Sequence, residues 1–435
     1  MPNGLDELCT EVLAEHGCAS LSLAVAERDE VVLTRAYGLA DVAERRPATP
    51  DTVYGLASVT KAFTATAVRL AAAEGLLDLD APLPGRHPRT APTPRQLLQH
   101  RGGFPAFYTF HYGTGPLPID ADRYRTPVRE PGTAFEYSNL GYQELGHLLE
   151  SATGRPLGDH LRERIAEPLG LTGFAFGAAY DGPAPVATRY SAGGRPYPTC
   201  RTSHPAATAA WATAGDVALF ARTSSRLLDP VPEPAVPINA HTGYGYGRLV
   251  SYGPGPVVHS HGGGMGGVAA MMIDFPEHEL SLAVLANSTD KSARDLVVRH
   301  LATALVPGFR PELLDTGSET ARPAALPPGR WSGTITTPEG PVPLRLDLSA
   351  PDRVRIHLAD APPVTTTATA STRSDLRATA PLQLPTSDAR LNSPHLGLDL
   401  RLHQDTLTGR AIAYRPDDRE GLLGSYLPHP CTLRR

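Results

Sequence analysis

A serine followed three residues later by a lysine is the strongest chemical feature of the sequence. Ser58-Val59-Thr60-Lys61 opens a stretch of helix-forming residues that runs from Ser58 to Glu74 and ends at Gly75. Residues three apart on a helix share one face, so the Lys61 amine can reach the Ser58 hydroxyl. Burial lowers a lysine pKa, and the neutral amine can then deprotonate the serine. The pair predicts acyl transfer through a covalent serine intermediate, and a capping serine followed by a solvated lysine is the structural alternative.

A tyrosine and an asparagine form the second motif. Tyr137-Ser138-Asn139 follows the loop Glu130-Pro131-Gly132-Thr133. A phenol beside a lysine can pass a proton between nucleophile and leaving group, so Tyr137 is predicted to be catalytic together with Ser58 and Lys61. The Asn139 amide is predicted to bind a substrate amide. Taken alone, such a tripeptide is more typical of a turn.

The third motif is a histidine followed by glycines, from His261 to Gly267. Glycines in a strand let a substrate lie against the backbone. The residues predicted to bind substrate here are His261, Gly262 and Gly263. The N–H groups of Ser58 and Gly264 are predicted to form an oxyanion hole. A nucleotide-binding loop is disfavoured because the run lacks a GKS/T ending and a βαβ context.

A metal site is the alternative interpretation of this strand, since His259 and His261 would point to the same face. No acidic residue follows at ligand spacing and the sequence has no HExxH motif, so neither a metal nor a cofactor is expected. The four cysteines also lack CxxC spacing and are expected to be isolated reduced thiols.

In this order along the chain, S-x-x-K, Y-x-N and H-G-G resemble the serine β-lactamase and DD-peptidase superfamily. The resemblance covers about residues 4–307 and includes the segment Leu97–Pro105. Tyr137-x-Asn139 matches the branch of class C β-lactamases, esterases and D-aminopeptidases. His261 stands where lactamases and carboxypeptidases carry lysine, which makes antibiotic resistance a less expected role.

The resemblance implies a division of labour among the motif residues. Ser58 would attack a carbonyl, Lys61 would accept its proton, and Tyr137 would protonate the leaving group. Water or an amine would then resolve the acyl-enzyme. Which of the two acceptors is used decides between a hydrolase and an acyltransferase.

The elements that must position these motifs follow from periodicity. In chain order they are a helix near 5–13, strands over 19–26 and 30–37, helices over 58–74 and 142–153, strands over 257–259, 268–273 and 280–286, and a helix over 290–305. Strands framed by a first and a last helix indicate an α+β fold with a mainly antiparallel sheet flanked by helices, as in β-lactamases and transpeptidases.

The chain of 435 residues is longer than one hydrophobic core usually supports. We expect a catalytic domain over 1–307, a proline-rich linker over 308–330 and an all-β domain over 331–435 that resembles lipocalin-like barrels. Two further proline-rich segments, 181–198 and 229–237, are expected to be loops that could cover the site.

Charge and hydropathy limit the partners. The 40 Lys and Arg against 45 Asp and Glu give a net charge of −5 without a basic block, so nucleic acid is not an expected partner. The sequence contains no run of about 18 apolar residues, so a membrane span is not expected. The N-terminal residues lack a basic region followed by an apolar one, so the expected location is the cytoplasm.

A cytoplasmic catalytic domain followed by a β-barrel-like domain resembles the penicillin-binding-protein-type thioesterases. We therefore favour a trans-acting thioesterase that releases and macrocyclises a nonribosomal peptide, with a peptide or other acyl substrate and a peptide-synthetase carrier protein as partners. A cytoplasmic esterase, D-aminopeptidase or DD-carboxypeptidase-like hydrolase is the alternative. An inactive binding protein on the same fold is the alternative of another class, and the joint presence of Ser58, Lys61, Tyr137 and Asn139 argues against it.

Overall fold

The computed structural model describes residues 4–84, 91–227, 236–315, 321–324, 326–350, 352–418 and 420–435. The chain forms two compact units that are both discontinuous in sequence. The N-terminal unit comprises 1–104, 129–316 and 418–422, and the barrel unit comprises 105–128, 317–417 and 423–435. The segments 105–128 and 418–422 thus each belong to the unit on the other side of the boundary expected from composition. Residues 316–320 and 325 of the expected linker lie outside the described residues.

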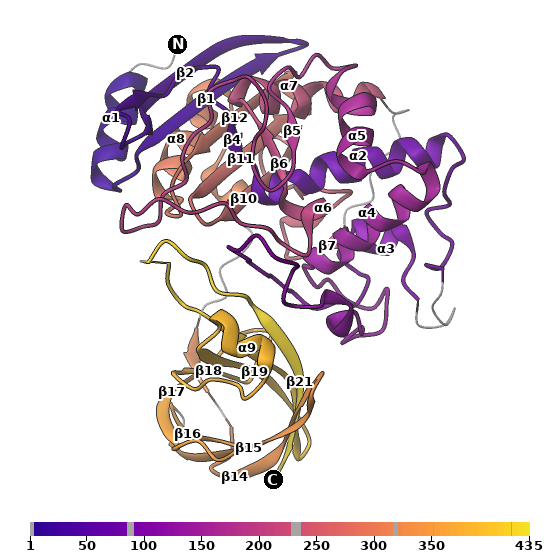
Figure 1. The fold of residues 1–435 in the computed structure, drawn as a ribbon, viewed down its shortest axis with the longest axis vertical. Coiled ribbons are helices and arrows are strands. Elements are labelled where there is room, and N and C mark those ends of the chain that lie inside the picture. Colours follow the sequence, from indigo (N-terminus) through magenta and orange to yellow (C-terminus); the bar gives the residue numbers. More distant parts are fainter. Residues whose placement is uncertain are drawn as a thin grey trace. The chain divides into compact units, whose positions relative to one another are not determined.

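The N-terminal unit is built on a nine-stranded antiparallel sheet in the order β3-β2-β1-β12-β11-β10-β9-β8-β7 (Figure 1). Its strands are β1 (Ser20–Glu27), β2 (Glu30–Asp41), β3 (Arg46–Pro47), β7 (Val236–Pro237), β8 (Thr242–Tyr244), β9 (Leu249–Ser251), β10 (Val258–Met265), β11 (Val268–Phe275) and β12 (Leu280–Ala286). The antiparallel sheet expected from the sequence is confirmed.

Helices cover both faces of this sheet, and strand β1 shows why. Successive side chains of a strand point to opposite faces. Leu21 and Leu23 pack in a core with α1 (Leu5–Glu15) and α8 (Ser292–Leu305). The smaller Ala24 and Ala26 pack in a second core with α2 (Thr60–Ala73) and α7 (Ala214–Thr223). Strand β1 is therefore apolar on both faces instead of alternating.

The start of the central helix differs from the expected helix over 58–74. Residues Ala57–Val59 form a 3-10 turn, η1, and α2 begins only at Thr60. Ala57 has a φ of +45°, in the left-handed region, which is incompatible with a continuing α-helix and places Ser58 in the tight turn. The far end is as expected, since Gly75 follows α2 with a φ of +74°.

The helix expected over 142–153 begins three residues earlier. The hydroxyl of Ser138 accepts a hydrogen bond from the Gly141 N–H at 3.2 Å and caps α4 (Asn139–Thr153). Gly154, with a φ of +67°, ends the helix. Asn139 is therefore the first residue of α4.

Short elements complete the N-terminal unit. They are β4 (Tyr54–Gly55), α3 (Pro94–Leu98), α5 (Leu157–Leu161), the π-helical turn η3 (Arg162–Ala166), β5 (Ala175–Phe176), α6 (Pro205–Thr208), β6 (Ala210–Ala212), η4 (Ser224–Leu227), η5 (Pro276–His278) and η6 (Pro311–Leu314). Of the two expected covering loops, 229–237 lies outside the described residues except for Val236 and Pro237, whereas 181–198 is described and joins the unit through bridges from Val186 and Tyr190.

The barrel unit contains eight antiparallel strands in the order β17-β16-β15-β14-β21-β20-β19-β18, and pairing between β17 and β18 closes the barrel. The strands are β14 (Gly329–Thr337), β15 (Gly340–Ala350), β16 (Arg353–Leu358), β17 (Val364–Ala370), β18 (Leu376–Ala380), β19 (His395–His403), β20 (Thr406–Tyr414) and β21 (Leu427–Arg434). The edge strand β13 (Arg322–Pro323), the turn η2 (Ala121–Tyr124) and α9 (Ser387–Asn392) also belong to this unit. Trp331, Leu346 and Ile356 are buried at alternate strand positions, and the expected barrel domain is confirmed.

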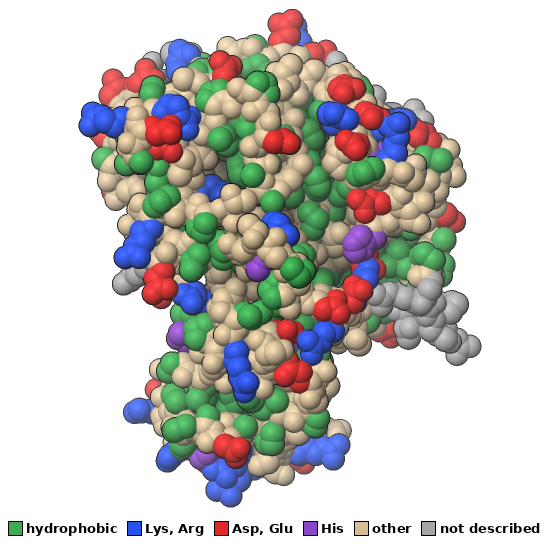
Figure 2. All heavy atoms as spheres, in the orientation of Figure 1, with side chains coloured by type: hydrophobic (Ala, Val, Ile, Leu, Met, Phe, Trp, Pro, Cys, Tyr) green, Lys and Arg blue, Asp and Glu red, His purple; other side chains and the backbone are tan. Residues whose placement is uncertain are grey.

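Cys9, Cys18, Cys200 and Cys431 are buried and free, as expected. In the described part of the chain, no helix combines the length and apolar character that crossing a membrane requires. On the face drawn in Figure 2, basic and acidic side chains are intermingled.

Candidate active site

Ser58 and Lys61 are in direct contact. Ser58 lies in η1 with 9% of its surface exposed, and Lys61 lies one turn later on α2 and is fully buried. The Nζ atom of Lys61 is 3.2 Å from Oγ of Ser58 and donates a second hydrogen bond to the Ala207 carbonyl at 3.1 Å. When the amine is neutral, the direction of the hydrogen bond is reversed, and the Ser58 hydroxyl donates to the Lys61 nitrogen.

Burial sets the protonation of Lys61. Removal from water penalises the ammonium form and lowers the pKa of Lys61 well below its ordinary value of 10.5. The segment containing α6 encloses the lysine, because Thr64 of α2 donates to the Ala206 carbonyl at 2.7 Å. Thr60 of α2 also accepts the Ala210 N–H at 3.0 Å. A lowered pKa is what a lysine base for Ser58 requires.

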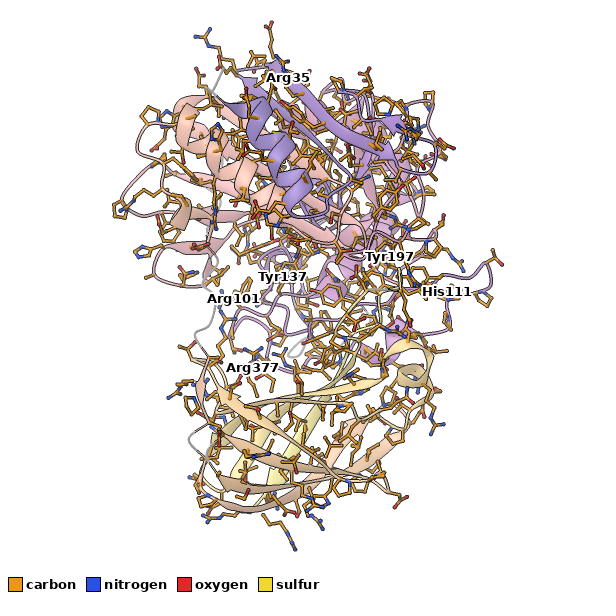
Figure 3. All side chains as sticks on the ribbon, turned by 90° about the vertical axis from the view of Figure 1, so that its left-hand side faces the viewer. Arg35, Arg101, His111, Tyr137, Tyr197 and Arg377 are labelled. Carbon is orange, nitrogen blue, oxygen red and sulfur yellow. The ribbon has the colours of Figure 1, made fainter. Side chains whose placement is uncertain are left out.

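Tyr137, labelled in Figure 3, joins this pair. The Lys61 Nζ lies over the Tyr137 ring, 4.8 Å from its centroid. The rings of Tyr137 and His261 have centroids 6.4 Å apart. The structure therefore brings together Ser58, Lys61, Tyr137 and His261 from three separate parts of the chain. Asn139, two residues beyond Tyr137, is fully buried at the first position of α4.

The protonation of His261 follows from its two hydrogen bonds. Its Nδ1 is 2.9 Å from the Gly262 carbonyl oxygen, which can only accept, so Nδ1 carries the hydrogen. Its Nε2, 3.0 Å from the Tyr244 hydroxyl, then accepts that O–H. Burial and the charge of Lys61 lower the pKa of His261 to about 3. His261 is thus a neutral imidazole at physiological pH.

The glycine run lies in the second half of β10. Strand β9 pairs with only the first three residues of β10, Val258–Ser260. Residues 261–265 pair with β11 on one side, and no strand among the described residues pairs with them on the other. A Cβ at position 263 would overlap the Leu56 carbonyl oxygen, two residues before Ser58. Glycine at 263 thus lets β10 approach the turn that carries Ser58. Gly264, the expected oxyanion donor, is the next residue on this edge.

Sequence reasoning missed four side chains of this site. They are His100, Tyr142, His204 and Tyr244. The charge of Lys61 contributes to lowering the pKa of His204 to about 3 and that of His100. The Tyr142 ring centroid is 5.7 Å from Lys61 Nζ. Tyr244 lies in Thr242-Gly243-Tyr244-Gly245, where an aromatic residue between glycines was the available signal.

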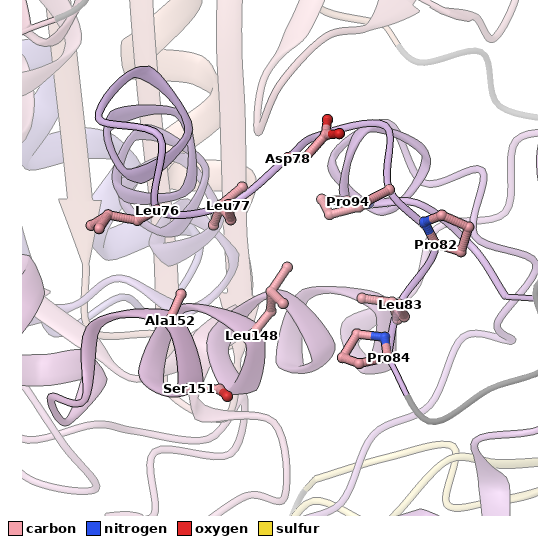
Figure 4. A pocket seen from close by; sticks show the side chains of 11 residues that line it. Leu76, Leu77, Asp78, Pro82, Leu83, Pro84, Pro94, Leu148, Ser151 and Ala152 are labelled. Atoms are coloured by element: carbon pink, nitrogen blue, oxygen red, sulfur yellow. The ribbon is translucent and has the colours of Figure 1, made fainter.

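A separate surface pocket lies away from this cluster (Figure 4). Its lining is mainly apolar and comes from the segment after α2, from the start of α3 and from the end of α4. Leu77, Leu83 and Leu148 are among the lining residues. Its lining does not include the residues placed around Ser58, so it is not assigned to the chemistry.

The family model described as Beta-lactamase matches residues 5–305. Esterase EstB from Burkholderia gladioli is 33% identical over 204 residues, which are 40% of this chain and 51% of that protein. A D-aminopeptidase from Brucella anthropi is 36% identical over 162 residues, 34% of this chain and 31% of that protein. The chain thus spans about half of the first relative and a third of the second.

Solved structures extend the likeness to both units. The crystal structure of SurE with D-Leu covers 98% of this chain and 99% of its own, with a TM-score of 0.67 and 22% identity, which shows the fold alone. The D-amino acid amidase from Ochrobactrum anthropi SV3, complexed with L-phenylalanine amide, covers 69% of this chain and 98% of its own at 27% identity and a TM-score of 0.56. Since the family model spans more than half of the chain, and its range includes Ser58, Lys61, Tyr137, Asn139 and His261, the chain belongs to the Beta-lactamase family.

Proposed function

We propose that this enzyme is a trans-acting thioesterase that releases and macrocyclises a nonribosomal peptide. The observation that carries acyl-enzyme chemistry is the 3.2 Å contact between Ser58 and the fully buried Lys61. The proposal includes a peptide-synthetase carrier protein as the donor of the thioester and the cytoplasm as the place of reaction.

In the acylation step, the Ser58 oxygen forms a bond to the thioester carbonyl carbon while its proton passes to the neutral Lys61 amine. The N–H groups of Ser58 and Gly264 hold the oxyanion. The carbon–sulfur bond then breaks and the thiolate takes a proton from Tyr137. Lys61, whose Nζ lies over the Tyr137 ring, returns the proton to the phenolate.

In the second step, an amine of the bound peptide attacks the acyl-enzyme. The amine nitrogen forms the amide bond, its proton passes through Tyr137 and Lys61, and the Ser58 oxygen leaves as the hydroxyl. A well-oriented intramolecular amine reaches effective molarities of roughly 10⁵ M or more, which lets it outcompete water.

A D-configured acyl residue is part of the proposal. By name, a D-aminopeptidase, a D-amino acid amidase and a structure holding D-Leu are among the proteins similar to this chain. The esterase and D-aminopeptidase relatives favour simple hydrolysis as the second candidate function.

Thioesters of linear peptides that end in a D- or an L-residue test the proposal. We expect D-terminated thioesters to acylate Ser58, as detected by mass spectrometry, and to give more cyclic than linear product. Linear product from every peptide, together with fast cleavage of simple esters or D-amino acid amides, would identify a hydrolase. No adduct at Ser58 with a fluorophosphonate would instead favour the binding-protein alternative.

A further inference from the structure

His100 contacts the backbone on both sides of Tyr137. The His100 carbonyl accepts the Glu136 N–H at 2.8 Å, and the His100 Nδ1 accepts the Ser138 N–H at 3.1 Å. The imidazole also packs against the Tyr137 ring, with centroids 4.2 Å apart. One residue thus holds residues 136 and 138 through hydrogen bonds and residue 137 through its ring.

The backbone of His100 adopts an uncommon left-handed conformation. His100 has a φ of +55°, in the left-handed region that costs a residue with a Cβ about 1 kcal/mol or more. The side chain is 2% exposed. The neighbouring Arg101 supports the same loop, since its carbonyl accepts the Gly132 N–H at 2.8 Å.

The hydrogen bond from Ser138 requires a neutral imidazole. Nδ1 can accept only with a free lone pair, so Nε2 carries the hydrogen, and no described residue accepts it. Burial, Lys61 and His261 lower the pKa of His100 well below 6.5, so the ring stays neutral at physiological pH. The titratable groups around the ring are Lys61 of α2, His261 of β10, Tyr137, Tyr142 of α4 and Tyr244 of β8.

We propose that His100 is a positioning residue that holds the Tyr137 phenol in place for proton transfer to the leaving group. This inference rests on the proposed role of Tyr137. Three hydrogen-bonding or packing contacts from a single buried residue leave the segment 136–138 little freedom to rotate. The phenol can therefore stay beside Lys61 throughout the catalytic cycle.

Two variants isolate the Nδ1 acceptor. Asparagine and glycine both tolerate a left-handed backbone, and both lack the imidazole ring. The asparagine side chain also supplies an oxygen near the position of Nδ1, whereas glycine supplies none. A difference between His100→Asn and His100→Gly therefore reports the hydrogen bond to Ser138, and thermal denaturation of both variants verifies folding.

The kinetic readout is sensitivity to the leaving group. General acid catalysis contributes about 10²–10⁴-fold for a poor leaving group and little for an activated one. We expect His100→Gly to lower kcat/KM for an alkyl ester at least about 10-fold more than for a p-nitrophenyl ester, and we expect the same pattern for Tyr137→Phe. His100→Asn should keep the wild-type ratio. Equal losses for both esters in His100→Gly, or equal ratios in the two variants, would overturn the inference.

Crystal structures of the two variants separate this inference from the proposed chemistry. We expect the Tyr137 ring to be displaced in His100→Gly and to stay in place in His100→Asn, whatever the activity. An undisplaced ring in His100→Gly would overturn the positioning role. If the ring moves while Tyr137→Phe shows no dependence on the leaving group, the proton-donor role of Tyr137 fails and the positional contact stands.

Discussion

The Lys61 Nζ lies 3.2 Å from the Ser58 Oγ, and no part of the Lys61 side chain is exposed. The contact joins the proposed nucleophile to its proposed base, and burial lowers the pKa of that base and so favours its neutral form. Each of these two facts leads to a separate prediction, because the hydroxyl and the amine can be removed independently.

Replacement of Ser58 by alanine should abolish turnover and leave the fold intact. The missing hydroxyl forms the acyl bond, and a methyl group fits the space of the serine side chain. Fluorophosphonate labelling with intact-mass analysis should show one adduct on the wild type and none on Ser58→Ala, with similar melting temperatures. A Ser58→Ala protein that still turns over substrate would contradict the assignment.

The activity should follow the neutral form of Lys61 as pH changes. Protonation removes the base, so kcat/KM falls as pH drops through the pKa of Lys61 in the folded enzyme. Because burial lowers this pKa well below 10.5, activity should already be on its plateau at pH values where an ordinary lysine is charged. Initial rates with a p-nitrophenyl ester between pH 5 and 10 measure the position of this acid limb.

His261→Ala provides the control for that profile. The pKa of His261 is lowered to about 3, so the histidine does not titrate across the measured range. The acid limb should therefore persist in His261→Ala. A limb that disappears with His261, or a wild-type rate that rises tenfold per pH unit up to pH 10, would contradict Lys61 as the base.

Lys61→Ala should slow turnover more than His261→Ala. Lys61 contacts Ser58, the proposed nucleophile, whereas the Nε2 of His261 accepts a hydrogen bond from Tyr244 and its Nδ1 donates to Gly262. Loss of a general base typically costs about 10²–10⁴-fold. Single-turnover acylation rates of the two variants test the ranking, and the reverse order would require a serine–histidine mechanism.

Two neighbouring glycines of β10 should differ sharply in their tolerance of alanine. A Cβ at 263 overlaps the Leu56 carbonyl, whereas a Cβ at 262 lies 3.7 Å from Met271 Cε, an ordinary contact. Gly263→Ala should destabilise the enzyme by about 1–3 kcal/mol and reduce acylation of Ser58, because β10 must move away. Gly262→Ala should stay within about 1 kcal/mol. Urea denaturation and acylation rates of both variants provide the comparison, in which equal behaviour would exclude close packing as the role of Gly263.

Several features of this protein depend on neighbours in sequence, and for that reason the sequence alone determined them. A spacing of three residues brings Lys61 to Ser58 through helical geometry, even though the first turn is 3-10. Alternating apolar residues after Trp331 indicated an all-β domain, and the order of S-x-x-K, Y-x-N and H-G-G pointed to the family. The start of α4 was misplaced because the capping contact of Ser138 is a matter of side-chain geometry.

The tertiary structure alone decided the features that join residues distant in sequence. His100 lies 38 positions from Ser138, and neither periodicity nor composition predicts their hydrogen bond. The lowered pKa of Lys61 depends on α6 and its neighbours packing against α2. These properties arise from burial and from contacts between separate elements, and their energies exist only once the sheet and helices have packed.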